Sequence, residues 1–393
     1  MKRKNKASRA SGSRSGLQGK KIDIEIESLS NTGDGVGRLD NRVVFVPFTM
    51  PGDRLRVTVT ADKRTFLLAE ISELLAPSTD RIDPDCEYFQ HCGGCAWQHI
   101  PYHYQLKVKA EHVADALERI GGIVDAPFAP IVPSVTDYHY RNRIQGTVRD
   151  GKFFQHRKSS QQLIAIASCL IADEKINNAI AERVPVMSPG KVEIAVVDEE
   201  IRLLPMIDRS TELGFRQVNS AVNTLLANLV LSLISKSQCK KVYDLYCGRG
   251  GWTNQIAREN PALTVTGIDS ARVNIEAATR SATELELSNV GYIQAKVEES
   301  LGVVGEKYTL YIVDPPRSGL DPLVTRALCK KRADDLIYVS CHPATLARDL
   351  KLLTEAAYRL ELVQPFDMFP QTSHVECLVY LRSTARRSSQ PSV

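Results

Sequence analysis

The sequence predicts an α/β protein in which a small β-barrel and a mixed α+β central domain precede a doubly wound parallel sheet. Residues 22–75 alternate apolar and polar side chains between glycine-rich turns, as short barrel strands do. Residues 130–205 have the pattern of mixed strands. From about Phe215, short apolar strands alternate with helical segments, which is typical of a Rossmann-like sheet covered by helices.

The length of 393 residues exceeds that of one ordinary domain, so we expect several compact units. The predicted boundaries are 21–76 for the barrel, 77–210 for the central domain and 211–383 for the doubly wound domain. A disordered basic arm, 1–20, and a flexible tail, 384–393, are expected at the two ends.

The first 21 residues contain eight lysines and arginines and no acidic residue. Such arms commonly contact polyanions such as RNA, and a solubilising tail is the alternative. The start of the sequence lacks the apolar segment of a secretory signal, and no apolar stretch is long enough to span a membrane. We therefore expect a cytoplasmic protein that binds no membrane, and we expect it to be a monomer.

The barrel is predicted by period-two strands such as Ile22–Ile26 and Leu55–Val59. Turns at Thr32–Gly37 and Pro51–Asp53 separate the strands. Small barrels of this kind often bind oligonucleotides, and a purely structural β-module is the alternative.

The central domain begins with a cysteine cluster, and a helix is predicted after it over Tyr104–Ile120. Cys86, Cys92 and Cys95 place three thiols within ten residues. Four thiolates, or three thiolates and an imidazole, bind zinc, and four thiolates also bind a [4Fe–4S] cluster. The spacing leaves both metals open. The candidates for the fourth ligand are Cys169, His91 and His99.

The doubly wound domain begins with an amphipathic helix predicted over Ala221–Ser235. Buried strands follow, each separated from the next by a helical segment. The predicted strands are Lys241–Tyr246, Leu263–Asp269, Tyr308–Asp314 and Leu336–Ser340.

A turn containing Gly248 and Gly250 follows the first of these strands directly. Glycine lets the backbone approach a ligand closely, because no β-carbon intervenes. The next strand ends in Asp269, whose carboxylate can accept hydrogen bonds from ribose hydroxyls. Dinucleotide binders and S-adenosylmethionine methyltransferases share this layout.

Two features favour the methyl donor over a dinucleotide. The pattern Gly-x-Gly-Gly departs from the Gly-x-Gly-x-x-Gly expected around a pyrophosphate. Another strand ends in Asp314–Arg317, at the sheet edge where ligands bind. Methyltransferases of exocyclic amines usually carry Asn-Pro-Pro-Tyr here, so Asp-Pro-Pro-Arg argues against an amine substrate.

Cys341 follows a buried strand and precedes a helix predicted over Ala344–Thr354, whose positive end favours a thiolate. Carbon 5 of uracil is a poor nucleophile, and an enzyme activates it by adding a thiolate to carbon 6. A general base then removes the carbon 5 proton so that the thiol is eliminated. Glu376, among apolar neighbours that would raise its pKa, is the candidate base. The alternative for Cys341 is an inert buried thiol, and the alternative for Glu376 is a partly exposed glutamate of the strand. His342 and His374 flank the site, either as orienting groups or as structural turn residues.

Together these motifs resemble the RNA 5-methyluridine methyltransferase family. The resemblance extends from the barrel to the last strand and rests most specifically on the segments Ser340–Asp349 and Phe369–Glu376. It implies methylation of a uridine in RNA, with Cys341 as nucleophile and Glu376 as base. The resemblance departs mildly at His342, where the family often has Asn, and at Gly251, where many members carry Asn.

The resemblance also implies the cofactors and a TRAM domain, a small RNA-binding barrel, at 21–76. S-adenosylmethionine would be held by Gln217, Tyr246, Gly248, Gly250, Asp269 and Asp314. A [4Fe–4S] cluster would be held by Cys86, Cys92, Cys95 and Cys169.

Segments Tyr138–Arg143 and Phe153–Lys158 interleave aromatic side chains with cations, a composition that suits unpaired RNA bases and phosphates. Ordinary amphipathic strands are the alternative.

We expect 23S ribosomal RNA as substrate, with uridine 54 of transfer RNA as the alternative. Two rival functions are a radical methylase, whose Cys-x3-Cys-x2-Cys spacing differs from the one here, and a non-catalytic RNA-binding protein that retains the fold.

Overall fold

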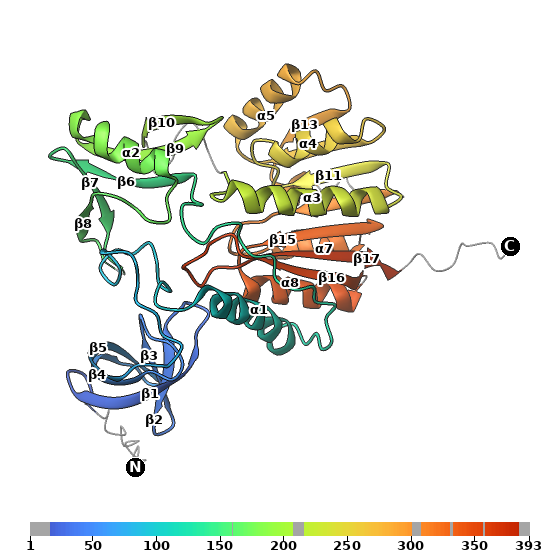
Figure 1. Ribbon diagram of the computed structural model, residues 1–393. Helices are drawn as coiled ribbons and strands as arrows, with labels where there is room; N and C mark the ends of the chain where they lie inside the picture. The colour runs from blue at the N-terminus through green and yellow to red at the C-terminus, as the bar shows by residue number, and fades with distance from the viewer. Residues whose placement is uncertain are drawn as a thin grey trace, which may run out of the picture. The chain divides into compact units, whose positions relative to one another are not determined.

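The computed structural model describes residues 16–158, 160–206, 216–300, 308–330, 333–356 and 358–384 (Figure 1). Most of the predicted basic arm and of the predicted tail, residues 1–15 and 385–393, lies outside the described residues. The chain divides into two compact units. One contains the chain up to Pro84 together with Ala96–Pro101, and the other contains Asp85–Cys95 and the chain from Tyr102 onward.

The first unit is a closed five-stranded barrel with the order β1-β2-β3-β5-β4, as the sequence predicts. Alternate side chains, such as Val44 and Val46, are fully buried inside it. The indole of Trp97 is also buried and donates to the carbonyl oxygen of Gly33 at 2.9 Å. Residues 96–101 therefore complete the barrel, although the cysteine loop interrupts the chain before them. The strands are β1 (Lys21–Leu29), β2 (Gly35–Leu39), β3 (Arg42–Val46), β4 (Arg54–Asp62) and β5 (Phe66–Ala76).

The second unit contains an antiparallel five-stranded sheet with the order β10-β9-β6-β7-β8. Helix α2 (Glu174–Glu182) packs on it through Ile176 and Ile180. This sheet confirms the mixed α+β architecture expected for the centre of the chain. Its strands are β6 (Arg143–Arg149), β7 (Lys152–His156), β8 (Leu163–Ile166), β9 (Gly190–Val197) and β10 (Glu200–Pro205), and a short 3-10 helix, η1, spans Val184–Val186.

A seven-stranded sheet with the order β13-β12-β11-β14-β15-β17-β16 forms the rest of this unit. The first five strands are parallel, and β17 runs antiparallel between β15 and β16. This is the doubly wound topology that the strand–helix alternation predicts. The strands are β11 (Lys241–Leu245), β12 (Thr264–Asp269), β13 (Val290–Gln294), β14 (Thr309–Val313), β15 (Asp335–Ser340), β16 (Tyr358–Phe366) and β17 (Glu376–Ser383).

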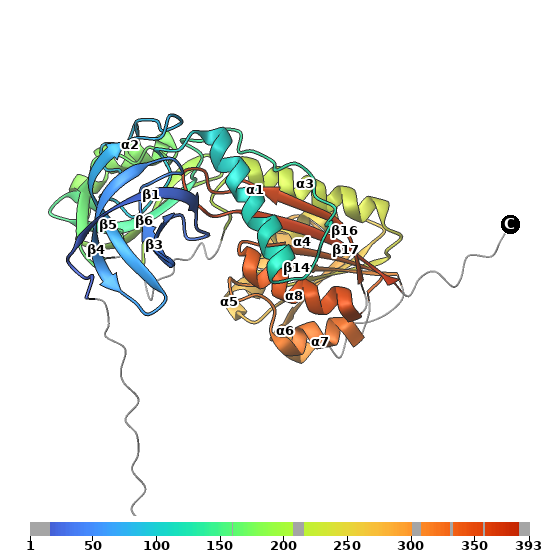
Figure 2. The ribbon, with the colours of Figure 1, turned by 90° about the horizontal axis from the view of Figure 1, so that it is seen from below.

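Helices cover both faces of this sheet (Figures 1 and 2). Helices α3 and α4 pack on one face, and α1, α6, α7 and α8 contribute to the core on the other. The predicted helix at Tyr104–Ile120 corresponds to α1. The helices are α1 (Tyr102–Arg119), α3 (Ser220–Lys236), α4 (Gly251–Glu259), α5 (Arg272–Glu284), α6 (Val297–Ser300), α7 (Pro322–Lys330) and α8 (Pro343–Ala356).

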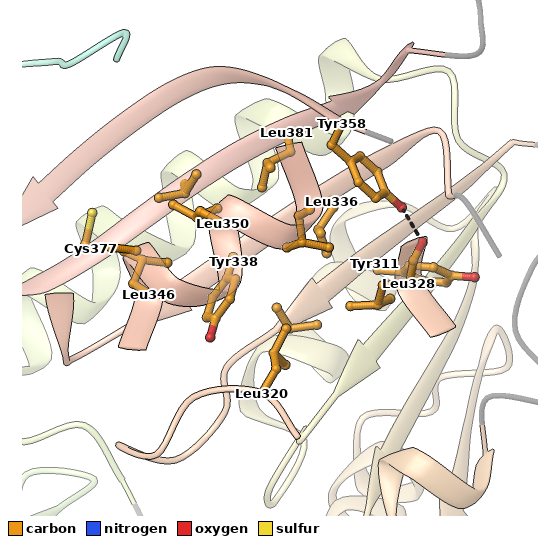
Figure 3. Close-up of a cluster of buried hydrophobic side chains, with 14 of the residues drawn as sticks. Tyr311, Leu320, Leu328, Leu336, Tyr338, Leu346, Leu350, Tyr358, Cys377 and Leu381 are labelled. Carbon is orange, nitrogen blue, oxygen red and sulfur yellow. Dashed lines mark hydrogen bonds between the residues drawn. The ribbon is translucent and has the colours of Figure 1, made fainter. Parts of the chain in front are cut away.

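Strand β15 is buried on both faces, because its side chains alternate between the two helical layers. Leu336 and Tyr338 pack with Leu346 and Leu350 of α8 (Figure 3), whereas Ile337 faces α3. Each fully buried aliphatic side chain contributes about 1.5–3 kcal/mol relative to exposure. The strand that leads to Cys341 is therefore rigidly held.

Within the described ranges, no helix is both long and apolar enough to cross a membrane.

Candidate active site

Three strands of the seven-stranded sheet end beside one another. The pairing of β11 with β12 and with β14 brings their carboxyl ends level. Tyr246, Asp269 and Asp314 therefore stand at the same edge of the sheet, where ligands bind in open α/β folds. All three are candidates for donor binding from the sequence, and the topology brings them together.

The glycine turn needs its glycines. Gly248 and Gly250 have φ angles of 54° and 76°, in the left-handed region that residues with a β-carbon rarely adopt. A β-carbon at Gly250 would also lie 2.5 Å from the hydroxyl oxygen of Tyr292. Gly250 caps the start of α4, whose first N–H groups thus face the sheet edge, as in anion- and nucleotide-binding turns.

Asp269 has a structural function that the sequence does not reveal. Its carboxylate accepts hydrogen bonds from the backbone N–H of Gly248 at 3.1 Å and of Ala271 at 2.8 Å. The side-chain amide of Asn274 donates to it at 3.2 Å. Asp269 thus fixes the glycine turn against the start of α5. Each carboxylate oxygen has two lone pairs, so acceptor capacity remains for a ribose hydroxyl.

Two carboxyl groups, the buried Asp244 and the half-buried Asp314, interact at this edge. Asp244, inside β11, is 2% exposed and accepts a hydrogen bond from the Thr253 hydroxyl at 2.6 Å. Burial raises the pKa of Asp244 to about 7. Burial, reinforced by the charge of Asp244, also raises the pKa of Asp314 to about 7. A cationic ligand here would favour the ionised forms of both. Sequence reasoning missed Asp244, although a carboxylate within an apolar strand is a signal that could have identified it.

The antiparallel pairing of β15 with β17 brings the candidate nucleophile and base together. Ser340 is the partner of Cys377, so Cys341 and Glu376 occupy the next opposed positions. Glu376 is 2% exposed, and Cys341 is half-buried. Burial, followed by the charge of Asp314, raises the pKa of Glu376 well above its usual range.

The Cys341 thiol is held mainly in its neutral form by its surroundings. Burial, followed by the charge of Glu376, raises its pKa to about 11. The guanidinium of Arg317 opposes this and also lowers the pKa of Glu376. Arg317 is thus the cation that faces both groups.

The two histidines predicted to flank the site differ in their surroundings. The Nε2 atom of His374 lies 3.5 Å from a guanidinium nitrogen of Arg317. Desolvation, followed by the charge of Arg317, lowers the pKa of His374 to about 4, so the ring is neutral at neutral pH and can accept a hydrogen bond. The Nδ1 atom of His342 instead accepts from the backbone N–H of Thr345 at 3.3 Å, which helps to cap α8.

Gln217, the remaining donor candidate, lies three residues before the first residue of α3. Its side chain is half-buried, and its backbone carbonyl accepts a hydrogen bond from the Asn142 amide at 3.0 Å. Asn142 precedes β6, so this contact joins the central sheet to the doubly wound domain.

The four candidate cluster cysteines come from two segments, the loop that contains Cys86, Cys92 and Cys95 and the turn after β8. The N–H of Ala167 donates to the Tyr88 hydroxyl at 3.1 Å and joins these two segments, whereas the N–H of Gly93 donates to the carbonyl of His156 at 2.9 Å and joins the loop to β7. Cys169 lies just beyond Ala167. Of the candidates for the fourth ligand, His99 belongs to the barrel unit, whereas Cys169 lies in the same unit as Cys86–Cys95.

The thiols influence one another electrostatically. Burial, and after it the charge of Cys86, raises the pKa of Cys92; burial, and after it the charge of Cys92, raises that of Cys169. Among the described residues, no three metal-ligating side chains adopt a geometry that could hold an ion. The donor set of four half-buried thiols nevertheless has the chemistry that an iron–sulfur cluster requires.

Comparisons with known proteins agree with these features. Residues 191–384 match the tRNA (uracil-5-)-methyltransferase family, and residues 17–72 match the TRAM domain. An uncharacterized RNA methyltransferase of Bdellovibrio bacteriovorus is 32% identical, over 94% of this chain and 97% of the relative. A 23S rRNA (uracil(1939)-C(5))-methyltransferase of Pseudomonas putida is 29% identical, over 92% of this chain and 93% of the relative.

Solved structures confirm the fold. The tRNA (uracil-54, C5)-methyltransferase of Pyrococcus abyssi, in complex with S-adenosyl-L-homocysteine, superimposes with a TM-score of 0.69 at 24% identity. The match covers 92% of this chain and all of that one.

The charges around Cys341 predict opposite effects of two neighbouring substitutions on thiol reactivity. At pH 8, Asp314→Asn removes a negative charge and should speed alkylation of Cys341 by iodoacetamide, whereas Arg317→Gln removes a positive charge and should slow it, each by about two- to tenfold. At pH 6 the Asp314→Asn effect should largely vanish, because the aspartate is then mostly protonated. Peptide mass spectrometry measures both rates, with Cys239 as the internal reference. Effects of the same sign would contradict the assigned electrostatics.

Proposed function

The chain belongs to the RNA (uracil-5-)-methyltransferase family, and we propose that it transfers a methyl group from S-adenosylmethionine to carbon 5 of a uridine in RNA through a covalent adduct with Cys341. The observation that carries the mechanism is the position of Cys341 opposite Glu376, at the sheet edge that contains Asp314. We assign methyl transfer to residues 211–383, and RNA binding to the barrel, 21–76, and the central domain, 77–210.

In this mechanism the thiolate of Cys341 adds to carbon 6 of uracil, and the electrons of the carbon 5–carbon 6 double bond move into an enolate. The bound donor supplies an electrophilic methyl group, which carbon 5 attacks as the sulfonium bond breaks. The carboxylate of Glu376 then removes the proton on carbon 5. The double bond re-forms, and Cys341 leaves as a thiolate.

The charges at the site favour this sequence once its substrates are bound. Cys341 and Glu376 both have raised pKa values, chiefly because burial disfavours their anions. A sulfonium cation beside Asp314 would favour the ionised forms of all three groups. Arg317 already acts in the same direction on Cys341 and Glu376.

The donor residues have separate tasks in this proposal. Asp269 and Tyr246 would hold the adenosine portion at the ends of β12 and β11, and Gly248 and Gly250 leave the backbone accessible to it. Gln217 would bind from the start of α3. The assignments of Tyr246 and Asp269 follow from their common position at the carboxyl edge of the sheet. The assignment of Gln217 rests on the family resemblance alone.

An open groove of 560 Å³ beside the cysteine loop supports RNA binding by the central domain. Its wall includes Gly93 and Gly94 on the loop and the cations of Arg157 and Lys158 at the end of β7. Cations beside an exposed glycine backbone suit phosphate oxygens. Ribosomal 23S RNA is the proposed substrate, in keeping with the relative from Pseudomonas putida, and uridine 54 of transfer RNA is the alternative.

We also propose a [4Fe–4S] cluster on Cys86, Cys92, Cys95 and Cys169. The hydrogen bond from Ala167 to the Tyr88 hydroxyl, which joins the two cysteine segments, supports it. The cluster would hold the loop and the β8–α2 turn together next to the groove; methyl transfer itself requires no electron.

Substitutions of the nucleophile and the base should block different steps. Cys341→Ala should reduce methyl transfer at least about 10³-fold while S-adenosylmethionine still binds. Glu376→Gln should permit addition and methyl transfer but block elimination, so that tritium from a labelled donor methyl group remains on the protein. The probe is total RNA from cells that lack this gene, followed by a denaturing gel. Turnover by Cys341→Ala, or normal product release by Glu376→Gln, would refute the mechanism.

The RNA substrate can be identified by mass mapping of RNA from cells with and without the gene. We expect one or more 5-methyluridines to disappear from 23S ribosomal RNA and to return when the gene is restored. Restoration with Cys341→Ala is the control and should not return them. Loss of 5-methyluridine from transfer RNA alone would select the alternative substrate.

Removal of a cluster ligand should release iron without affecting donor binding. Protein purified without oxygen should contain equal amounts of iron and acid-labile sulfide, and Cys95→Ser should lose most of both. Calorimetric binding of S-adenosylmethionine should stay within about twofold, since the donor site uses another sheet. Cys239→Ser is the matched control and should retain its iron. Zinc in place of iron would select the other metal.

A further inference from the structure

The segment that leads to Glu376 is held by buried polar contacts from α1. This segment, residues 367–375, connects β16 to β17 and will be called the base loop. On α1, Gln105 and Lys109 lie four positions apart and therefore share one helical face. Both side chains are fully buried.

Lys109 forms an ion pair at the beginning of the base loop. Its ammonium group lies 2.6 Å from a carboxylate oxygen of Asp367, and both side chains are 0% exposed. The ammonium also donates to the backbone carbonyl of Phe369 at 3.0 Å, and the Phe369 N–H donates to Asp367 at 3.2 Å. Lys109 thus fixes the backbone as well as the side chain of this turn.

Gln105 holds the middle of the base loop. Its amide donates to the side-chain oxygen of Gln371 at 2.9 Å, and its own oxygen accepts from the Gln371 backbone N–H at 3.0 Å. Gln371 has a φ angle of 66°, which is unfavourable for a residue with a β-carbon. Such a conformation persists where the surroundings determine it strongly, and it is often found at functional sites.

The opposite side of the base loop is held by the segment before β6. The hydroxyl of Tyr140 donates to the carbonyl of Pro370 at 3.1 Å. The next residue, Gln371, forms the two hydrogen bonds with Gln105 described above. The base loop is therefore fixed on two sides immediately before it delivers Glu376 to β17.

Buried ion pairs of this type are poorly explained by stability alone. Desolvation of both charges offsets much of their attraction, and an apolar pair of similar volume often stabilises a protein as well or better. The pair does, however, require one particular geometry, because an ammonium and a carboxylate must meet where water is excluded. Lys109 and Asp367 thus select one conformation of the loop.

We propose that Lys109 and Gln105 are positioning residues for the base, because they hold the base loop in the conformation that directs Glu376 towards Cys341. This inference rests on the proposed function, in which Glu376 takes the carbon 5 proton. Displacement of the base would slow the last chemical step selectively. Binding of the donor, which uses the ends of β11, β12 and β14, would change little.

The test compares Gln105→Leu and the double variant Lys109→Met/Asp367→Leu with the exposed control Lys107→Met on the same helix. The double variant leaves no unpaired charge in the interior, so it avoids the main cause of unfolding. Thermal melts establish folding first. We expect kcat to fall about 10- to 100-fold, with KM for the donor within about twofold, in both interior variants. The control, whose side chain is 65% exposed, should behave like the unaltered protein.

The decisive measurement is methyl-labelled protein after reaction with total RNA from cells that lack the gene. Both interior variants should accumulate labelled adduct, as Glu376→Gln does, because elimination becomes the slow step. If Glu376→Gln itself yields no labelled adduct, the proposed function fails. If Glu376→Gln yields adduct but the folded interior variants turn over normally, or lose activity without adduct, only this inference is overturned. Should the double variant not fold, Gln105→Leu decides alone.

Discussion

The antiparallel insertion of β17 between β15 and β16 is the constraint on which the candidate site depends. In a purely parallel sheet, the edge where ligands bind contains only the carboxyl ends of strands. Because β17 runs the opposite way, its first residue, Glu376, lies at the edge where β15 ends. Pairing of Ser340 with Cys377 then fixes Cys341 opposite Glu376. A slip of one residue would turn every side chain of β17 to the other face, where it would meet the other helical layer, so the packing of each side chain against its own layer secures the register.

The same edge gathers negative charge. Asp244, Asp314 and Glu376 all have raised pKa values because burial disfavours their ionised forms, and the charge of Arg317 opposes this shift at Glu376. Three carboxyl groups at one edge repel one another when ionised, and a cationic ligand would favour their ionised forms. The strain of Gln371 and the buried pair at Lys109 belong to the same region. Stability and function are therefore in tension at this edge, as is common where a site needs fixed geometry.

Local patterns predicted much of this molecule. The predicted strand Leu336–Ser340 differs from β15 by one residue at its start. The position of Asp314 at the end of a strand is also predicted, because it directly follows an apolar run in the sequence. Such local patterns do not predict which residues far apart in the sequence pair with each other in the fold. Nothing in the sequence around Lys109 indicates a partner 258 positions away, and its periodicity on α1 suggests only a helix. The separation of His99 from the cysteines likewise depends on tertiary packing. The covalent role of Cys341 and the cluster remain predictions.

The return of the chain to the barrel at residues 96–101 has a consequence for biosynthesis. Trp97 fills the barrel and bonds to Gly33, so packing of this unit is completed only by residues made after the cysteine loop. As the chain emerges from the ribosome, the five strands appear first, and Cys86, Cys92 and Cys95 must be exposed before the indole can close the barrel. Cys169, the fourth ligand of the proposed cluster, emerges later still. Packing of the two units is thus ordered by the path of the chain itself, since the cysteine loop is made before the barrel can be completed.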